Sequence, residues 1–404
     1  MPTKRTLAQE VTGPLKGLRI IDLTSVVLGA YATGILGDLG ADVIKIESPL
    51  GDRGNGGDVM RWAGDGPNPK IRDLGPIFMT INRNKRSLLL DLREEKAKRT
   101  LRRLIKTADV FCANVRYEGL KRMGMSYEDV AAIKPDIVYV HAAGYGSEGP
   151  YAGQPAYDDL IQAGAGFGDI ASKTDGDPTP RYVPTLVADK VSGLFMSQAI
   201  MAGVIHKQKT GEGQFIEVPM LETMTSFLLA EHLYGRVYNP EAAMCYTRVA
   251  NVHRKPFKTK DGYVGLMPYN NKQWDDFFAI DGRPGLVSSD PRFRDYETRT
   301  KHIGELYAMV EEVSVKKTTQ EWLDILRPLS IPVVKLNRLE DLMTDEHLDK
   351  VGLFETYEHP EVGPYTTVRS PFRFSKTPPN IRRHPPRLGE HTAELEAEAD
   401  KLPD

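Results

Sequence analysis

The stretch LRIIDLTSVVLGAYATGILGDLGADVIKIE, residues 18–47, decides the fold. Residues 18–23 form a short apolar run rich in β-branched side chains, which is typical of a buried strand. The glycine-punctuated segment 26–41 repeats its apolar residues at helical spacing and runs into a second apolar segment at 42–47. We therefore predict strand, helix and strand within about thirty residues, the size of one βαβ unit.

The same alternation continues along the chain. Helices are predicted at 94–106, 127–133 and 191–208, and further strands at 87–92, 107–115, 136–146 and 213–220. Strands that alternate with helices indicate an α/β fold with a mostly parallel, Rossmann-like sheet. After residue 225 the pattern changes, because a hairpin with an Asp261–Gly262 turn and amphipathic helices at 271–280 and 301–313 are predicted there.

The chain has 404 residues, which predicts two or three domains at about 150 residues each. We expect a large Rossmann-like domain in residues 1–225 and a smaller α+β domain in residues 226–330. Residues 331–404 are expected to return to the large domain, through the apolar run at 331–336 and the string SPFRFSKTP. The smaller domain would then be an insertion.

Composition excludes several classes of protein. Lys plus Arg is 53 and Asp plus Glu is 55, so the formal charge of −2 gives no basic surface for nucleic acid. Cys112 and Cys245 form no CxxC pair and no HxxxH or HExxH string occurs, so we expect no metal site. The longest apolar run, residues 194–205, is shorter than the about twenty residues of a membrane helix. We expect a cytoplasmic enzyme.

The glycines of segment 26–41 do not form a dinucleotide or phosphate-loop motif. GxGxxG is absent, and the GxxxxG spacing of Gly29 and Gly34 is not followed by Lys and Ser or Thr. We interpret these glycines as points of close packing. Glu47, at the end of the second strand, is an alternative acceptor for ribose hydroxyls.

Cations near the ends of predicted strands suggest a polyphosphate ligand. Arg93, Arg116 and Arg122 lie at or just beyond such ends, where open α/β sheets bind ligands. The basic run NRNKRS, residues 82–87, has two interpretations, a solvated turn or an anion clamp.

Asp189 is the most suggestive carboxylate, because uncharged residues precede it and the predicted helix at 191–208 follows it. One interpretation is a helix N-cap that accepts backbone amides. The other is a partly desolvated carboxylate that stays ionised and fixed and acts as a nucleophile. The residues alone leave both interpretations open.

Several strings together resemble the class III CoA-transferase family, also called the CaiB/BaiF family. They span nearly the whole chain in the family's order: GPLKGLRIIDLTSVVLGAYATGILGDLGADVIKIESP, FMTINRNKRSLLLDL, ADVFCANVRYEGLKRMGMSYEDV, IVYVHAAGYGSEGPYAGQPAYDDLIQAGAG, LVADKVSGLFMSQAIMAGVIHKQKTGEGQFIEVPMLE and SPFRFSKTP followed by PRLGEHT.

The resemblance implies that Asp189 is the catalytic nucleophile, because ADKVSG stands where the family has a GDxxxG-like string. Asp158 is expected to orient the site or to contact CoA. The residues expected to contact CoA are Val27, Leu28, Leu90, Asp91, Leu92, Arg93, Asn114, Val115, Arg116, Arg122, Pro155, Ala156, Tyr157 and Asp158. Two departures are Ser48, where some relatives carry Arg, and the lack of a Gly-rich run between Arg236 and Lys255.

The resemblance also implies an interlocked homodimer, or a heteromer with a paralogous subunit. The expected partners are an acyl-CoA and a carboxylic acid, with no nucleic acid, no membrane and no tightly bound cofactor. CoA would move from the donor to the acid through an aspartyl-CoA thioester. The basic residues Arg248, His253, Arg254 and Lys255 weakly favour a dicarboxylate such as succinate, with a solvated basic face as the alternative.

Three other functions stay open at this point. Acyl-CoA racemases of the same family carry a catalytic His where YDDL has Tyr157, which favours the transferase, because Tyr has a reference pKa of about 10. A nicotinamide-dependent oxidoreductase lacks support from any GxGxxG string. A non-catalytic CoA-binding protein would not need Asp189.

Overall fold

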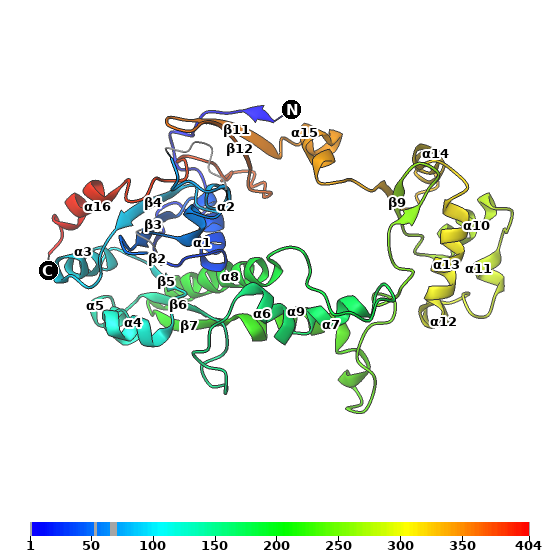
Figure 1. The fold of residues 1–404 in the computed structure, drawn as a ribbon, viewed down its shortest axis with the longest axis horizontal. Helices are drawn as coiled ribbons and strands as arrows, with labels where there is room; N and C mark the ends of the chain where they lie inside the picture. The colour runs from blue at the N-terminus through cyan, green and yellow to red at the C-terminus, as the bar shows by residue number, and fades with distance from the viewer. Residues whose placement is uncertain (1, 52–54, 65–70, 404) are drawn as a thin grey trace. The chain divides into compact units, whose positions relative to one another are not determined.

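The computed structural model describes residues 2–51, 55–64 and 71–403. The chain divides into two compact units, each described here by itself (Figure 1). Unit 1 comprises Met1–Ile161, Thr185–Met224 and Met343–Asp404, and unit 2 comprises Gln162–Pro184 and Thr225–Leu342. The domain limit drawn from the sequence at 225 stays a prediction, whereas unit 2 extends past the predicted limit at 330.

A six-stranded parallel sheet forms the centre of unit 1. Its strand order is β4-β3-β2-β5-β6-β7, which is 3-2-1-4-5-6 when the strands are counted along the chain, the doubly wound order. The predicted α/β fold with a parallel sheet is confirmed. The strands are β2 (Arg19–Leu23), β3 (Asp42–Glu47), β4 (Lys85–Leu89), β5 (Val110–Ala113), β6 (Val138–Ala143) and β7 (Gln214–Pro219).

Helices connect these strands, and α6 and α9 continue from unit 1 into unit 2. No helix among the described residues combines the length and apolarity needed to cross a bilayer. The helices that begin in unit 1 are α1 (Leu28–Asp38), η2 (Val59–Arg61), α2 (Pro76–Ile81), α3 (Glu95–Ile105), α4 (Tyr117–Met123), α5 (Tyr127–Ile133), α6 (Asp158–Gly164), α8 (Val187–Thr210), α9 (Met220–His232), α15 (Glu346–Lys350) and α16 (Thr392–Ala399).

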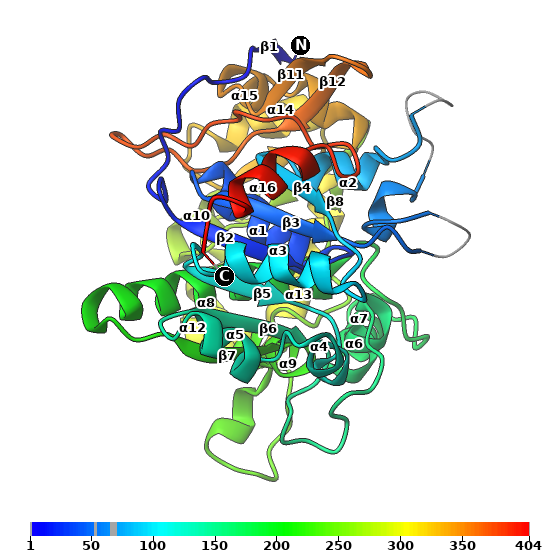
Figure 2. The same cartoon turned by 90° about the vertical axis from the view of Figure 1, so that its left-hand side faces the viewer.

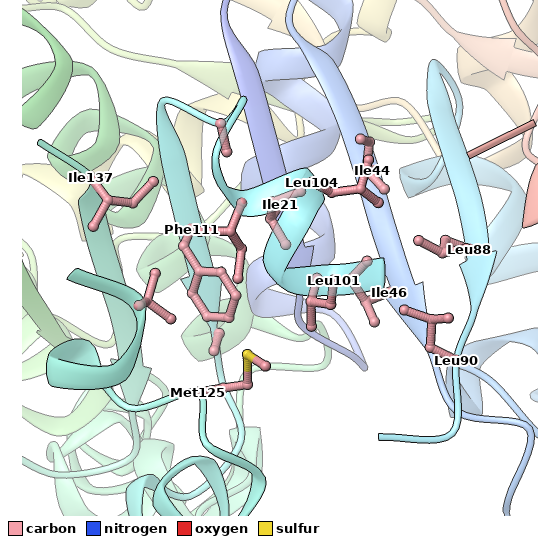
Figure 3. Close-up of a cluster of buried hydrophobic side chains, with 14 of the residues drawn as sticks. Ile21, Ile44, Ile46, Leu88, Leu90, Leu101, Leu104, Phe111, Met125 and Ile137 are labelled. Carbon is pink, nitrogen blue, oxygen red and sulfur yellow. The ribbon is translucent and has the colours of Figure 1, made fainter. Parts of the chain in front are cut away.

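One face of the sheet is apolar. Ile21, Ile44 and Phe111 of the central strands share a buried cluster with Leu101 and Leu104 of α3 (Figure 3). Helix α16 lies beside α3 on the same side (Figure 2). Each fully buried side chain of this kind contributes about 1.5–3 kcal/mol, so this face supplies much of the stability of unit 1.

The other face of the sheet carries charged side chains that are fully buried. The Lys85 ammonium lies 3.2 Å from the Asp22 carboxylate, and it also donates to the carbonyl oxygen of Ala30 at 2.9 Å and to the hydroxyl of Thr33 at 2.8 Å. Burial lowers the pKa of Lys85 to about 8, although Asp22 opposes this shift. A buried charge is tolerated only when it is paired and hydrogen-bonded, so these contacts hold α1 to the sheet.

Both interpretations of the basic run NRNKRS are wrong. Arg83 forms an ion pair with Asp38 of α1 at 2.5 Å, and Arg86 forms one with Asp42 of β3 at 2.6 Å. Both guanidinium groups are buried, as is Lys85. The three cations are therefore internal counter-ions, neither solvated nor free to bind phosphate. Charge counted along the sequence does not reveal partners that lie distant in the chain.

Small residues let α1 approach its neighbours closely. A Cβ atom added at Gly34 would lie 2.4 Å from the carbonyl oxygen of Ile81, and one added at Gly193 of α8 would lie 2.7 Å from that of Leu28. Real side chains do not tolerate such distances, so close packing at Gly34 is confirmed, although its neighbour is helix α2 and not a strand as expected.

The C-terminal segment of unit 1 covers the edge strand β4. The carbonyl oxygen of Ser87 accepts a hydrogen bond from the N–H of His391 at 3.0 Å, and the N–H of Leu89 donates to the hydroxyl of Thr392 at 3.0 Å. Covering an edge removes a template for pairing with other chains. The same segment contributes to a second sheet, in the order β1-β11-β12, built from β1 (Thr3–Lys4), β11 (Phe354–His359) and β12 (Gly363–Val368).

Unit 2 has its own aromatic core, in which Trp274, Phe277 and Trp322 are buried. The predicted hairpin at Asp261–Gly262 is confirmed, because β8 and β9 pair in antiparallel fashion on either side of that turn. The elements of unit 2 are β8 (Phe257–Lys258), β9 (Tyr263–Leu266), β10 (Val333–Lys335), α7 (Phe167–Ser172), η3 (Tyr234–Val237), α10 (Asn271–Ile280), α11 (Leu286–Ser289), α12 (Tyr296–Lys301), α13 (Ile303–Ser314), α14 (Thr319–Leu326) and η4 (Glu340–Thr344), which ends in unit 1.

The expectation that residues 331–336 return to the large domain is wrong. Strand β10 pairs with β9, with Val333 opposite Leu266, and so completes the small sheet of unit 2. A short apolar run predicts a strand, but it carries no information about which sheet the strand joins. The later string SPFRFSKTP, residues 370–378, lies in unit 1.

The variant Lys85→Met is expected to lower the free energy of unfolding by about 3–5 kcal/mol, because it leaves the buried carboxylate of Asp22 without its partner. Urea denaturation measures this loss. Lys16→Met, at an exposed position, is the control and should change stability by less than about 0.5 kcal/mol. Equal effects of the two substitutions would contradict the role of the buried pair.

Candidate active site

Asp189 lies inside the first turn of α8, not before the helix. The helix begins at Val187, four residues earlier than the sequence predicted, and its N-cap is Leu186, which makes no side-chain capping bond. The interpretation of Asp189 as the N-cap is therefore wrong. Its side chain projects from the first turn with only 8% of the residue exposed.

A second carboxylate holds the backbone at this point. One oxygen of Asp158 accepts a hydrogen bond from the N–H of Asp189 at 3.0 Å. Asp158 begins α6 and is 5% exposed, so it satisfies one of the N–H groups that the start of α8 leaves unpaired. This contact fixes the position of Asp189 from a distant part of the chain.

The surroundings of Asp189 disfavour its charged form. Burial, followed by the negative charge of Asp158, raises the pKa of Asp189 to about 7. Desolvation and the like charge of Asp158 thus oppose the ionised form that the sequence analysis expects at this helix start. No described residue donates a hydrogen bond to its carboxylate oxygens, which leaves them free to react.

A cavity of about 360 Å³ opens at the carboxyl ends of the central strands. Open α/β sheets bind their ligands at this edge. Five of the residues that the sequence predicts as CoA contacts line the cavity, and Ser48 lines it as well. The five are Leu90, Asp91, Leu92, Arg93 and Val115.

The side chain of Asn114 links the loop after β5 to the loop after β2 through hydrogen bonds, at the point where the strand order reverses. Its side-chain oxygen accepts from the N–H of Ser25 at 3.0 Å, and its amide nitrogen donates to the carbonyl oxygen of Ser25 at 2.8 Å. Ser25 follows β2 and Asn114 follows β5, the neighbouring strands on either side of the reversal. The predicted CoA contact at Asn114 is thus engaged with the loop that leads into α1.

The other predicted contacts lie around the same edge of the sheet. Val27 is the N-cap of α1 and Leu28 its first residue, and both are buried. Arg116, the N-cap of α4, and Arg122, within α4, are exposed and have no ion-pair partner among the described residues. Pro155, Ala156 and Tyr157 precede α6, and Ala156 packs on Gly144 just beyond β6. Tyr157 is 67% exposed.

The helix of Asp189 runs beside the start of α1. Gly193, one turn after Asp189, packs against the carbonyl oxygen of Leu28. The structure therefore brings the predicted nucleophile close to two of the predicted CoA contacts, Val27 and Leu28, although these segments are far apart in the sequence.

Two buried residues beside the cavity were missed in the sequence. Lys45 and Asp58 form an ion pair of 2.8 Å, and both side chains are fully buried. The signal was present, because Lys45 interrupts the apolar run at 42–47 and a lysine in a buried strand needs a partner. Asp58 had no such signal, since it lies in a loop between elements.

In unit 2 the basic residues near Arg248 separate into two kinds. His253 and Lys255 both lie close to Glu311, at 3.1 and 3.2 Å. Arg248 donates to the sulfur of Met267 at 3.3 Å and lies 5.8 Å from the ring centre of Tyr269. It has no carboxylate partner in the described part of unit 2.

The described residues contain no group of three or more His, Cys, Asp and Glu side chains suited to a metal ion. Unit 1 offers a fixed, buried carboxylate in the first turn of α8 and a cavity at the carboxyl edge of the sheet. A carboxylate of this kind can act as a nucleophile in group transfer.

Comparison with known proteins agrees with this geometry. The family model for CoA-transferase family III matches residues 15–392. Succinyl-CoA:glutarate CoA-transferase of Mus musculus is 33% identical over 385 residues, which cover 95% of this chain and 85% of the relative. Succinate–glutarate CoA-transferase of Agrobacterium fabrum is 30% identical over 400 residues and 96% of both chains.

A solved structure agrees as well. The crystal structure of a CAIB/BAIF family protein from Brucella suis has a TM-score of 0.78 and 30% sequence identity, and the match covers 96% of this chain and all of that one. The resemblance stated from the sequence is confirmed: the chain belongs to CoA-transferase family III and is an enzyme of that class.

Proposed function

We propose that Asp189 is the nucleophile through which this CoA-transferase moves CoA from a donor acyl-CoA to a carboxylic acid. One observation supports this assignment above all: the Asp189 carboxylate is buried and accepts no hydrogen bond from any described residue. A structural carboxylate in such a place would be paired, as Asp22 is with Lys85.

The reaction proceeds in four balanced acyl transfers. The Asp189 carboxylate attacks the donor thioester, which forms a mixed anhydride and releases CoA thiolate. The thiolate attacks the aspartyl carbonyl, which gives the aspartyl-CoA thioester and frees the donor acid. The acceptor carboxylate then displaces the thiolate and forms a second anhydride. The thiolate finally attacks the acceptor acyl carbonyl, which yields the new acyl-CoA and restores Asp189.

The cavity at the carboxyl edge of the sheet is proposed to hold the CoA part of the substrate. Leu90, Leu92 and Val115 supply an apolar wall, and Arg93 supplies a cation at the rim. Exposed Arg116 and Arg122 add positive charge on α4. Arginine suits phosphate groups because its guanidinium can form two parallel hydrogen bonds. CoA then acts as a substrate, and no tightly bound cofactor is needed.

We propose succinyl-CoA as the donor and a dicarboxylic acid as the acceptor. The names of the mouse and Agrobacterium relatives support this choice. Arg248 supports it as well, because a half-buried guanidinium that has no carboxylate partner among the described residues is suited to a free carboxylate of the acid.

The remaining expectations also belong to this proposal. The smaller domain is an insertion in the larger one, and two copies of the chain form an interlocked homodimer that works in the cytoplasm. A heteromer with a paralogous subunit is the alternative assembly, and the mass of the purified enzyme in solution distinguishes the two.

Incubation with succinyl-CoA followed by hydroxylamine is expected to leave a hydroxamate on Asp189, because hydroxylamine captures anhydrides and thioesters. Mass spectrometry of the Asp189 peptide measures this. Asp189→Ala and Asp189→Asn should carry no label and lose about 10⁴-fold or more in kcat. An unlabelled peptide together with full activity of Asp189→Ala would rule the mechanism out.

The variant Asp158→Asn is expected to move the acidic limb of the kcat/KM profile to lower pH. The reactive form of Asp189 is the carboxylate, so activity rises as Asp189 ionises around pH 7. Removing the negative charge of Asp158 lowers the pKa of Asp189, whereas the Asn oxygen still accepts the Asp189 N–H. Asp159→Asn, at an exposed neighbour, is the control and should leave the limb in place. A limb that stays in place in both variants would show that Asp158 does not act on the charge of Asp189.

The variant Arg248→Met is expected to raise KM for glutarate about tenfold or more, because a charged hydrogen bond to the acid is lost. KM for pentanoate, which has the same length and one carboxylate fewer, should not change. Lys255→Met is the control, since Lys255 already pairs with Glu311. Equal effects on both acids would contradict the recognition of a second carboxylate.

A further inference from the structure

In the loop between β2 and α1, two consecutive peptide groups form all their hydrogen bonds with side chains from other segments. Lys45 donates to the carbonyl oxygen of Thr24 at 2.8 Å. Asn114 bonds both the N–H and the carbonyl oxygen of Ser25. Asp58 accepts from the N–H of Val26 at 3.1 Å. Because side chains from other segments satisfy all four of these groups, the geometry of this loop is imposed from outside.

The imposed conformation is unfavourable for its own sequence. Val26 has a φ of 67°, in the left-handed region. A β-branched residue is a genuine outlier there, because its side chain crowds the backbone. Strained residues persist only where the surrounding structure over-determines them, and they concentrate at functional sites.

Asp58 is itself rigidly placed. Its second oxygen pairs with Lys45 at 2.8 Å, and its first oxygen also accepts from the N–H of Met60 at 3.0 Å. Its own N–H donates to Glu47 at 3.0 Å, and Glu47 is clamped by Arg61 at 2.6 Å. Asp58 and the residues that hold it, Lys45 and Glu47, therefore form a fixed frame for the loop that follows β2.

This frame adjoins the cavity, because Thr24, Ser25 and Asp58 line it together with Leu92 and Arg93. We infer that Asp58 is a positioning residue for CoA binding: by holding the N–H of Val26, it keeps the loop in the one shape that completes the cavity. The inference rests on the proposed place of CoA in that cavity. Preorganisation of this kind acts on affinity, since binding need not first order the loop.

The test combines Asp58→Ala with Val26→Gly, since glycine adopts a positive φ without a clamp. We expect Asp58→Ala to raise the dissociation constant for CoA about tenfold or more, as measured by calorimetry. The KM for acyl-CoA should rise by a similar factor, whereas kcat should stay within about threefold of wild type. Val26→Gly alone should bind within about threefold of wild type. The double variant should recover most of the affinity lost in Asp58→Ala.

Three results would overturn the inference. The first is an unchanged affinity for CoA in Asp58→Ala. The second is a folded double variant that binds CoA no better than Asp58→Ala does. The third is a loss of CoA affinity in Asp73→Asn as large as that in Asp58→Ala. Asp73 is the matched control, because it is also buried and paired, here with Arg387 at 2.7 Å, but contacts no residue of the loop. Should Asp58→Ala fail to fold, Asp58→Asn tests the same contact with the opposite expectation. Asn keeps an acceptor for the N–H of Val26 and loses only the ion pair, so its affinity for CoA should stay within about threefold of wild type, and a tenfold loss would overturn the role of the Val26 contact.

Leu92→Trp separates this inference from the proposed CoA site. A tryptophan at this position fills the cavity that Leu92 lines, so CoA binding should be lost. Normal CoA binding in Leu92→Trp would move the CoA site elsewhere and remove the ground for both proposals. Lost binding in Leu92→Trp with normal binding in Asp58→Ala would keep the site and overturn only the positioning role.

Discussion

The buried ion pair between Lys45 and Asp58 is the interaction on which the binding edge of unit 1 depends. Although burial opposes the charged form, Asp58, Asp22 and Glu47 together raise the pKa of Lys45, so the ammonium stays charged inside the protein. A charge buried at this depth costs several kcal/mol unless its partner is in place. The ion pair therefore joins strand β3 to two other segments, the one that contains Asp58 and the loop that leads into α1. Formation of this pair also shapes the cavity that these segments border.

Neighbouring charges of opposite sign distinguish the structural carboxylates from the proposed nucleophile. Asp22 and Glu47 are buried, yet their pKa values are lowered, because Lys85 stands beside the first and Arg61 beside the second. Asp189 is buried with another carboxylate as its neighbour, and its pKa rises to about 7. Burial is common to all three. The sign of the neighbouring charge separates the two carboxylates that are held in ion pairs from Asp189, whose unpaired oxygens suit the nucleophilic role that we propose.

The sequence predicts local structure well because local structure depends on neighbours in the chain. The strands at 18–23 and 42–47 and the hairpin at Asp261–Gly262 are of this kind. Partners distant in the chain are not encoded in a single segment. The pairing of Arg83 with Asp38, the bond from Asp189 to Asp158 and the position of β10 beside β9 all required the fold. Motif resemblance identified Asp189, but no feature of the sequence predicts its raised pKa.

The doubly wound order of the sheet explains why the β2–α1 loop needs external support. In dinucleotide-binding sheets of this order, a glycine allows the tight turn after the first strand. This chain has Thr24, Ser25 and Val26 at that place, and the positive φ falls on valine. A network of Asp58, Lys45 and Asn114 takes over the role of the missing glycine. The exchange has a consequence for the CoA binding that we propose at this edge: a glycine loop can adapt to its ligand, but a valine held by three side chains cannot, so the site would select ligands that fit one preformed shape.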